Sequence, residues 1–176
     1  MALFLPTIAV NKVTDITPAL VRALKTDSIL LDVDNTLAFP GSQEPLEGTI
    51  EWAGAMKKAG IKILIMSNNF KKRVQPFVAK YDLPFMSFSV KPLPFAYFRA
   101  MRKLKAKRKD VVVVGDQIFT DVVGSNFSFM KSILLMPAVN ETSFSFRVKR
   151  KLEVAVRKRI LKKGLIAEDV LKQADL

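Results

Sequence analysis

The sequence predicts an α/β fold with a mostly parallel sheet flanked by helices. Short apolar runs that end in small or polar residues are typical of buried parallel strands, and segments with apolar residues at helical spacing lie between these runs. Because strands and helices alternate along the chain, we expect one parallel sheet. The expected strands are 28–34, 62–67, 111–116 and 132–136, and the expected helices are 45–60, 70–82 and 92–107.

Each expected element has a local cause. The strand segments SILLDVD, KILIMS and SILLM are rich in branched apolar residues, and VVVVGD begins with four valines. The first expected helix ends at Gly60, a common helix stop. The second contains Pro76, and the third carries apolar residues at helical intervals.

The chain has no cysteine and no histidine, which limits its chemistry. Serine–histidine and cysteine–histidine catalysis are excluded, as are iron–sulfur clusters and cysteine zinc sites. Carboxylates, hydroxyls, lysines and arginines remain, with a hard, oxygen-seeking cation as the expected metal. No apolar run approaches the ~20 residues of a membrane span, so we expect a cytoplasmic protein.

Acidic residues follow two of the expected strands. Asp32 and Asp34 end the first, and Asp116 ends the third, with Asp121 five residues later. Ligands bind beyond the carboxyl ends of parallel strands, so these side chains and Ser67 should converge on one crevice. A lone pair of aspartates is also an ordinary strand exit or helix cap. Clustered carboxylates repel one another unless a proton or a cation compensates them, and a site without histidine favours Mg²⁺.

Four segments in a fixed order carry a family resemblance. DVDNT (32–36), a strand that ends in Ser67, Lys91-Pro92 and GDQIFTD (115–121) together resemble the four motifs of the haloacid dehalogenase-like (HAD) phosphatases, over residues ~28–137. More narrowly, DVDNTL, IMSNN followed by Lys72-Arg73, VKP, and VVVVGDQIFTDVVG resemble the YqeG family of subclass IIIA. The resemblance implies a HAD-like, Rossmann-like sheet.

The resemblance also implies a phosphomonoester hydrolase that forms an aspartyl-phosphate intermediate. Asp32 would be the nucleophile, and Asp34 would act as general acid and then as general base. Ser67, the backbone around Asn68 and the ammonium of Lys91 would bind the phosphoryl group. Lys91 would also keep Asp32 ionised, because a nearby cation lowers the pKa of a carboxyl group.

The same resemblance implies a Mg²⁺ cofactor. The carboxylates of Asp32 and Asp116 and the backbone carbonyl of Asp34 would hold the ion, and Asp121 would bind it through water or orient its ligands.

The spacing of the motifs leaves no room for a large cap domain. Asp32 and Ser67 are 35 positions apart, and Ser67 and Lys91 are 24 positions apart. The loop 37–48 could form a small flap or an ordinary connection. We expect a single HAD-like phosphatase domain at 1–146 with a minimal cap, and a basic C-terminal helix and tail at 147–176 that pack on the same domain.

The net charge of +13, from 29 basic and 16 acidic residues, favours polyanionic partners or anionic surfaces. Residues 147–163 predict a basic amphipathic helix. Its apolar stripe suits packing on the sheet, and its nine basic residues suit an anionic bilayer. The sequence supports both interpretations.

Relatives in the YqeG family are associated with dephosphorylation of phosphatidylglycerophosphate. The resemblance therefore implies an anionic phospholipid substrate and peripheral contact with the inner face of the membrane. The alternative is an RNA- or ribosome-binding protein on a phosphatase scaffold, but the basic tail lacks interleaved aromatic residues for base stacking. The sequence does not define the oligomeric state.

Overall fold

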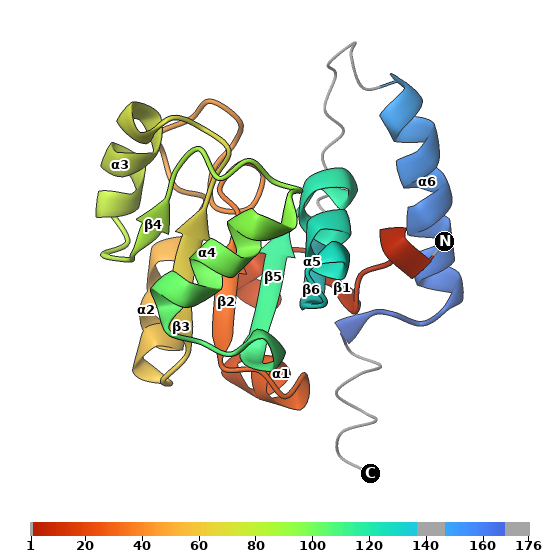
Figure 1. Cartoon of the computed structure of the whole chain (residues 1–176), viewed down its shortest axis with the longest axis horizontal. Helices are drawn as coiled ribbons and strands as arrows, with labels where there is room; N and C mark the ends of the chain where they lie inside the picture. Colours follow the sequence, from red (N-terminus) through yellow and green to blue (C-terminus); the bar gives the residue numbers. More distant parts are fainter. Residues whose placement is uncertain (1, 137–146, 168–176) are drawn as a thin grey trace.

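The computed structural model describes residues 2–136 and 147–167. In these residues six parallel strands form one sheet, in the order β1-β6-β5-β2-β3-β4 (Figure 1). The strands are β1 (Ile8–Val10), β2 (Ser28–Leu31), β3 (Lys62–Met66), β4 (Phe85–Met86), β5 (Val111–Gly115) and β6 (Lys131–Leu135). The predicted α/β class with a mostly parallel sheet flanked by helices is confirmed, and the sheet is open.

Helices cover both faces of the sheet (Figure 1). One apolar cluster joins the sheet to α1, α2 and α3, and the clusters on the other face join it to α4, α6 and the π-helical turn η4. The helices are α1 (Pro18–Ala23), α2 (Thr49–Lys58), α3 (Lys71–Ala79), α4 (Pro94–Leu104), α5 (Val123–Phe127) and α6 (Arg147–Lys162). The short helical turns are η1 (Ala2–Phe4), η2 (Val13–Asp15), η3 (Arg108–Asp110) and η4 (Ile118–Val122).

The central strand β5 shows why the sequence has four consecutive valines. Val112 and Val114 belong to the cluster under α1, α2 and α3, whereas Val111 and Val113 belong to the cluster under α4. A strand buried on both faces needs apolar side chains at every position. The run therefore fixes β5 in the middle of the sheet, where its end can hold a functional residue.

The predicted strands and helices are present, most of them with shorter bounds, and the strand predicted at 132–136 is shifted by one residue. The helices predicted at 45–60, 70–82 and 92–107 are α2, α3 and α4. The strands β1 and β4 were not predicted because they contain only three and two residues. Tertiary contacts define β1: it pairs with β6, and the amide of Ala9 donates to the carbonyl of Leu165 at 2.7 Å.

The C-terminal helix α6 packs on the sheet at its far end. Ile160 is fully buried with Ala9 of β1 and Ile118 of η4, while Leu161 remains exposed. The domain boundary predicted at residue 146 and the side chains of Lys149, Arg150 and Lys151 lie outside the described part of the chain. None of the helices described is long and apolar enough to cross a membrane.

Candidate active site

The site lies at the switch point of the sheet, between β2 and β5, where the chain connections lead in opposite directions. From β2 the chain continues to β3 on one side, whereas β5 continues to β6 on the other side. In open parallel sheets, ligands bind at this switch point, beyond the carboxyl ends of the strands. Asp32 follows β2, and its amide donates to the carbonyl of Val114 at 2.9 Å; Asp116 follows β5 directly. The backbone of the two central strands thus places both aspartates at the same edge.

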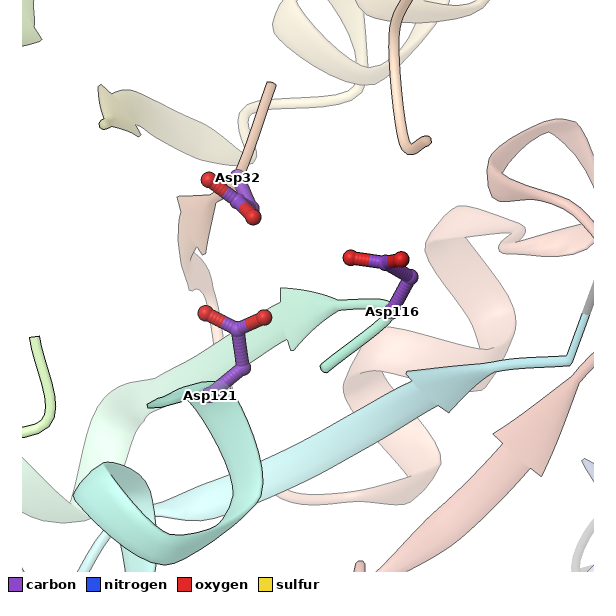
Figure 2. A group of neighbouring side chains, drawn as sticks. All are labelled: Asp32, Asp116 and Asp121. Atoms are coloured by element: carbon purple, nitrogen blue, oxygen red, sulfur yellow. The ribbon is translucent and has the colours of Figure 1, made fainter. Parts of the chain in front are cut away.

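Three carboxylates meet around one lysine at this edge. Figure 2 shows Asp32, Asp116 and Asp121 turned toward one another, and one oxygen of each lies within 4.8 Å of the others. The ammonium of Lys91 lies 2.7 Å from Oδ1 of Asp32 and 2.7 Å from Oδ1 of Asp121. Lys91, Asp32 and Asp121 are all buried, so their charges compensate one another in a setting of weak solvent screening.

Gly115 makes the approach of Asp121 possible. A Cβ atom at Gly115 would overlap the carboxylate of Asp121. The residue directly before Asp116 therefore has to lack a side chain. The other oxygen of Asp121, Oδ2, accepts a hydrogen bond from the amide of Gln117 at 3.2 Å. Both oxygens of Asp121 are thus engaged by the protein, which fits a residue that supports direct metal ligands.

Burial is the largest influence on the pKa values of Asp32 and Asp116. It raises the pKa of Asp32 from 3.8 to about 6, and the attraction of Lys91 does not offset it. Burial and the charge of Asp32 raise the pKa of Asp116 to about 8. Burial by itself would lower the pKa of Lys91, but the charges of Asp121 and Asp32 raise it overall. Lys91 lowers the pKa of Asp32, in the predicted direction, but the desolvation of Asp32 is the larger effect.

The cluster fits a divalent cation. Oδ2 of Asp116 accepts from Asn35 Nδ2 at 3.0 Å, whereas its Oδ1 is buried and has no hydrogen-bond partner in the described residues. A buried carboxylate oxygen without a partner is costly, and a cation would satisfy it. When ionised, three carboxylates exceed one ammonium by two negative charges. An oxygen-only donor set with that excess suits Mg²⁺.

The carboxylate of Asp34 contacts different side chains from those that hold Asp32. Its Oδ1 accepts from Arg73 Nη2 at 2.8 Å, and its Oδ2 accepts from Asn69 Nδ2 at 2.7 Å. Arg73 also donates to Oδ1 of Asn69 at 3.1 Å. The closed ring of three side chains fixes the carboxylate of Asp34 beside the cluster. Sequence reasoning did not assign Asn69 or Arg73 to the site, although both belong to the IMSNN and Lys72-Arg73 motif.

Ser67 and Asn68 join the loop after β3 to the loop that carries Lys91. The hydroxyl oxygen of Ser67 is buried and accepts from the amide of Asn69 at 3.2 Å. Oδ1 of Asn68 accepts from the amide of Lys91 at 2.8 Å and from the hydroxyl of Ser89 at 3.0 Å. The structure thus brings Ser67 and Lys91 to the same edge, and the side chain of Asn68 positions the backbone of Lys91.

Comparisons with known proteins agree with this geometry. Residues 16–124, which contain every predicted site residue, match the family model of haloacid dehalogenase-like hydrolases. The curated protein "Probable phosphatase YqeG" of Bacillus subtilis (strain 168) is 36% identical over 163 residues, which cover 93% of this chain and 95% of that protein.

Two further proteins are more distant. "Phosphatidylglycerophosphate phosphatase 1, chloroplastic/mitochondrial" of Arabidopsis thaliana is 28% identical over 149 residues, which cover 78% of this chain and 42% of that protein. The crystal structure of a hydrolase from Streptococcus pneumoniae TIGR4 aligns with a TM-score of 0.53 and 13% identity, over 73% of this chain and 99% of that one. At this identity, the structural similarity shows the fold alone.

The chain belongs to the haloacid dehalogenase-like hydrolase family. Within this family it is a homologue of YqeG, as the motifs predicted. The family, together with these two phosphatase relatives, identifies the chain as a phosphatase.

Proposed function

We propose that this phosphatase hydrolyses phosphate monoesters with Mg²⁺ and forms an aspartyl-phosphate on Asp32. The observation that carries the proposal is the buried ionic triad at the carboxyl edge of the sheet. Lys91 holds Asp32 and Asp121 at 2.7 Å each. A nucleophilic carboxylate has to be fixed in one orientation, and a lysine beside it can bind the negative oxygens of a phosphoryl group.

In the proposed reaction, a carboxylate oxygen of Asp32 attacks phosphorus, and the bond from phosphorus to the ester oxygen breaks. Water then cleaves the aspartyl-phosphate, which releases phosphate and restores Asp32. Lys91 and the hydroxyl of Ser67 bind the phosphoryl oxygens during both steps.

Asp34 is the proposed proton carrier. It gives a proton to the leaving alcohol oxygen in the first step and takes one from the attacking water in the second. Asn69 and Arg73 hold both of its oxygens, at 2.7 and 2.8 Å, and so keep the carboxyl group at the position where the proton is needed.

The metal ligands in this proposal are Asp32, Asp116 and the backbone carbonyl of Asp34, supported by Asp121. Bound Mg²⁺ supplies positive charge that compensates the phosphoryl oxygens. The unpartnered oxygen of Asp116 supports this assignment.

We further propose an anionic phospholipid with a terminal phosphate, such as phosphatidylglycerophosphate, as the substrate. The Arabidopsis relative is named for this substrate. In residues 2–136 and 147–167 no cap domain encloses the site, and the net charge of +13 suits an anionic substrate. The enzyme would then work in the cytoplasm, at the inner face of the membrane.

A phosphate-release screen with the purified full-length protein tests the proposal. Lipid, nucleotide and sugar monophosphates are compared with Mg²⁺, with EDTA, and with Ca²⁺ in place of Mg²⁺. We expect release from the lipid substrate with Mg²⁺, loss with EDTA, and poor replacement by Ca²⁺ because its coordination shell is larger and looser. If no monoester is hydrolysed, the proposed monoester hydrolysis fails, and binding to RNA or ribosomes becomes the alternative.

The Asp32→Asn variant tests the proposed role of Asp32 as the nucleophile. The amide keeps the shape of the side chain but removes its charge, so turnover should fall below about 1% of wild type. A variant with a native circular dichroism spectrum and higher turnover would contradict the role of Asp32.

A further inference from the structure

Two exposed phenylalanines stand beside the catalytic site. Phe70 is 72% exposed and Phe88 is 59% exposed, and their rings stack with centroids 5.4 Å apart. The amide of Phe88 donates to the carbonyl of Asn69 at 2.8 Å. Because Asn69 also contacts Asp34, the aromatic pair lies at the edge of the site described above.

The loop after β4 presents alternate residues to the site and to the surface. Ser89 and Lys91 are buried, whereas Phe88 and Val90 are exposed. Ser89 and Lys91 are held by Asn68, so the positions of their neighbours are also determined. Three apolar side chains, from Phe70, Phe88 and Val90, thus lie on the outer surface of the two loops that build the site. An exposed apolar patch next to a functional site indicates an interaction surface.

A basic cavity adjoins this apolar patch. It has a volume of about 390 Å³ and runs along the edge strand β4, with Lys71, Arg99 and Lys103 in its lining and no acidic residue. Its lining also includes Ser87, which directly precedes Phe88, and Lys71 directly follows Phe70. Each phenylalanine is therefore adjacent in sequence to a residue that lines the cavity.

We infer that this face, defined by Phe70, Phe88, Val90 and the basic cavity, docks on the surface of an anionic phospholipid bilayer. The phenylalanines enter the boundary between head groups and acyl chains, and the cavity receives a lipid phosphate. The inference rests on the proposed function, because docking at this edge brings the catalytic site to the surface that carries the proposed lipid substrate. It places membrane contact at β4, whereas α6 lies at the opposite end of the sheet (Figure 1).

The chemistry of the face favours lipid over single-stranded RNA. Proteins that bind single strands offer open aromatic faces on which bases stack. Here the two phenylalanine rings stack on each other, with an interplanar angle of 14°, and Val90 offers no ring. Apolar side chains beside a cluster of cations match the two layers of a bilayer surface, acyl boundary and charged head groups.

Vesicle flotation of the full-length protein tests the inference. The vesicles contain phosphatidylcholine alone, or phosphatidylcholine and phosphatidylglycerol in equal amounts. We expect wild type to bind the anionic vesicles, and Phe70→Ser/Phe88→Ser to reduce the partition coefficient about tenfold or more. Lys71→Gln/Arg99→Gln should reduce it at low salt and make little difference at high salt, where charges are screened.

Two matched controls separate this face from general properties of the protein. Phe127→Ser/Phe129→Ser removes two similarly exposed rings near the start of β6, on the side of the sheet away from β4. Lys158→Gln/Lys162→Gln removes the same charge from the exposed surface of α6. Neither control should change binding to vesicles by more than about twofold. Loss of binding in the α6 variant, with none in the Phe70/Phe88 and Lys71/Arg99 variants, would overturn the inference.

Two further measurements distinguish the possible failures. Hydrolysis of a small soluble ester reports the proposed function independently of vesicles, and we expect Phe70→Ser/Phe88→Ser to retain it. If wild type hydrolyses the ester but binds vesicles no better than the variants, the docking inference alone is wrong. If the phenylalanine variant instead loses binding to polyuridylate and keeps binding to vesicles, the face recognises RNA and the inference is overturned.

Discussion

Asp34 illustrates how neighbouring side chains set the role of one residue. It lies two positions after Asp32, yet the two carboxylates have different partners: Asp32 pairs with Lys91, and Asp34 pairs with Arg73 and Asn69. This separation fits the proposed reaction, in which Asp32 attacks phosphorus and Asp34 carries a proton.

The first prediction concerns Asp34→Asn. The amide cannot transfer a proton, so hydrolysis of an alkyl phosphate should fall about 100-fold or more. An aryl phosphate with an acidic leaving group needs little protonation, so burst kinetics with this ester should show partial recovery of the first step. An equal loss on both esters would argue against the proton-transfer role of Asp34.

At the scale of elements, β5 and η4 act together. The strand ends in Gly115, and the turn that follows brings Asp121 back over this glycine to reach Lys91. The short distance between strand and turn therefore determines the position of a buried charge.

The second prediction tests this contact with Gly115→Ala. The added methyl group would collide with the carboxylate of Asp121, so we expect the Mg²⁺ concentration for half-maximal activity to rise about tenfold or more. The matched control is Gly54→Ala in α2, where an added Cβ meets nothing within 4 Å. The control should keep wild-type Mg²⁺ dependence and gain about 0.5–1 kcal/mol of stability. A normal Mg²⁺ requirement in Gly115→Ala would contradict the role of this contact.

The central elements were predictable because their signals are local. The four valines of β5 and the branched residues of β2 and β3 show burial on both faces, and the strand ends place Asp32 and Asp116 together. By contrast, β1 and β4 are too short for a periodic signal, and their neighbours define them.

The partners of the site residues were less predictable than the residues themselves. The contact of Arg73 with Asp34 joins the first turn of α3 to the loop after β2, and no sequence pattern gives the direction of such a long side chain. The bridge from Asp121 to Lys91 depends on the space above Gly115. The protonation of Asp32 depends on the depth of its burial, which only the folded sheet defines.

For the whole molecule, the buried carboxylates connect stability to pH. Burial raises the pKa of Asp116 to about 8 and that of Asp32 to about 6, from 3.8. At pH values between the ordinary pKa of 3.8 and these raised pKa values, the folded protein keeps protons that the unfolded chain has released. The stability contributed by these protons is present at low pH and is lost as the pH rises through the folded pKa values.

The third prediction follows from this sign. In EDTA, the melting temperature should fall as the pH rises from about 5 to about 8. Mg²⁺ binds the ionised carboxylates, so the stabilisation by Mg²⁺ should increase over the same range. Thermal unfolding with and without Mg²⁺ measures both effects, and Asp116→Asn should weaken them. A Mg²⁺ effect that is constant with pH would contradict the raised pKa values.

The ionic triad also has a consequence for synthesis on the ribosome. Its members are Asp32, Lys91 and Asp121, so the proposed nucleophile is synthesised long before the groups that hold it. A nascent chain whose residue 121 has not yet left the ribosome therefore lacks a complete site. We therefore expect a ribosome-bound chain to hydrolyse no ester until β5 and η4 have been synthesised and have joined the sheet.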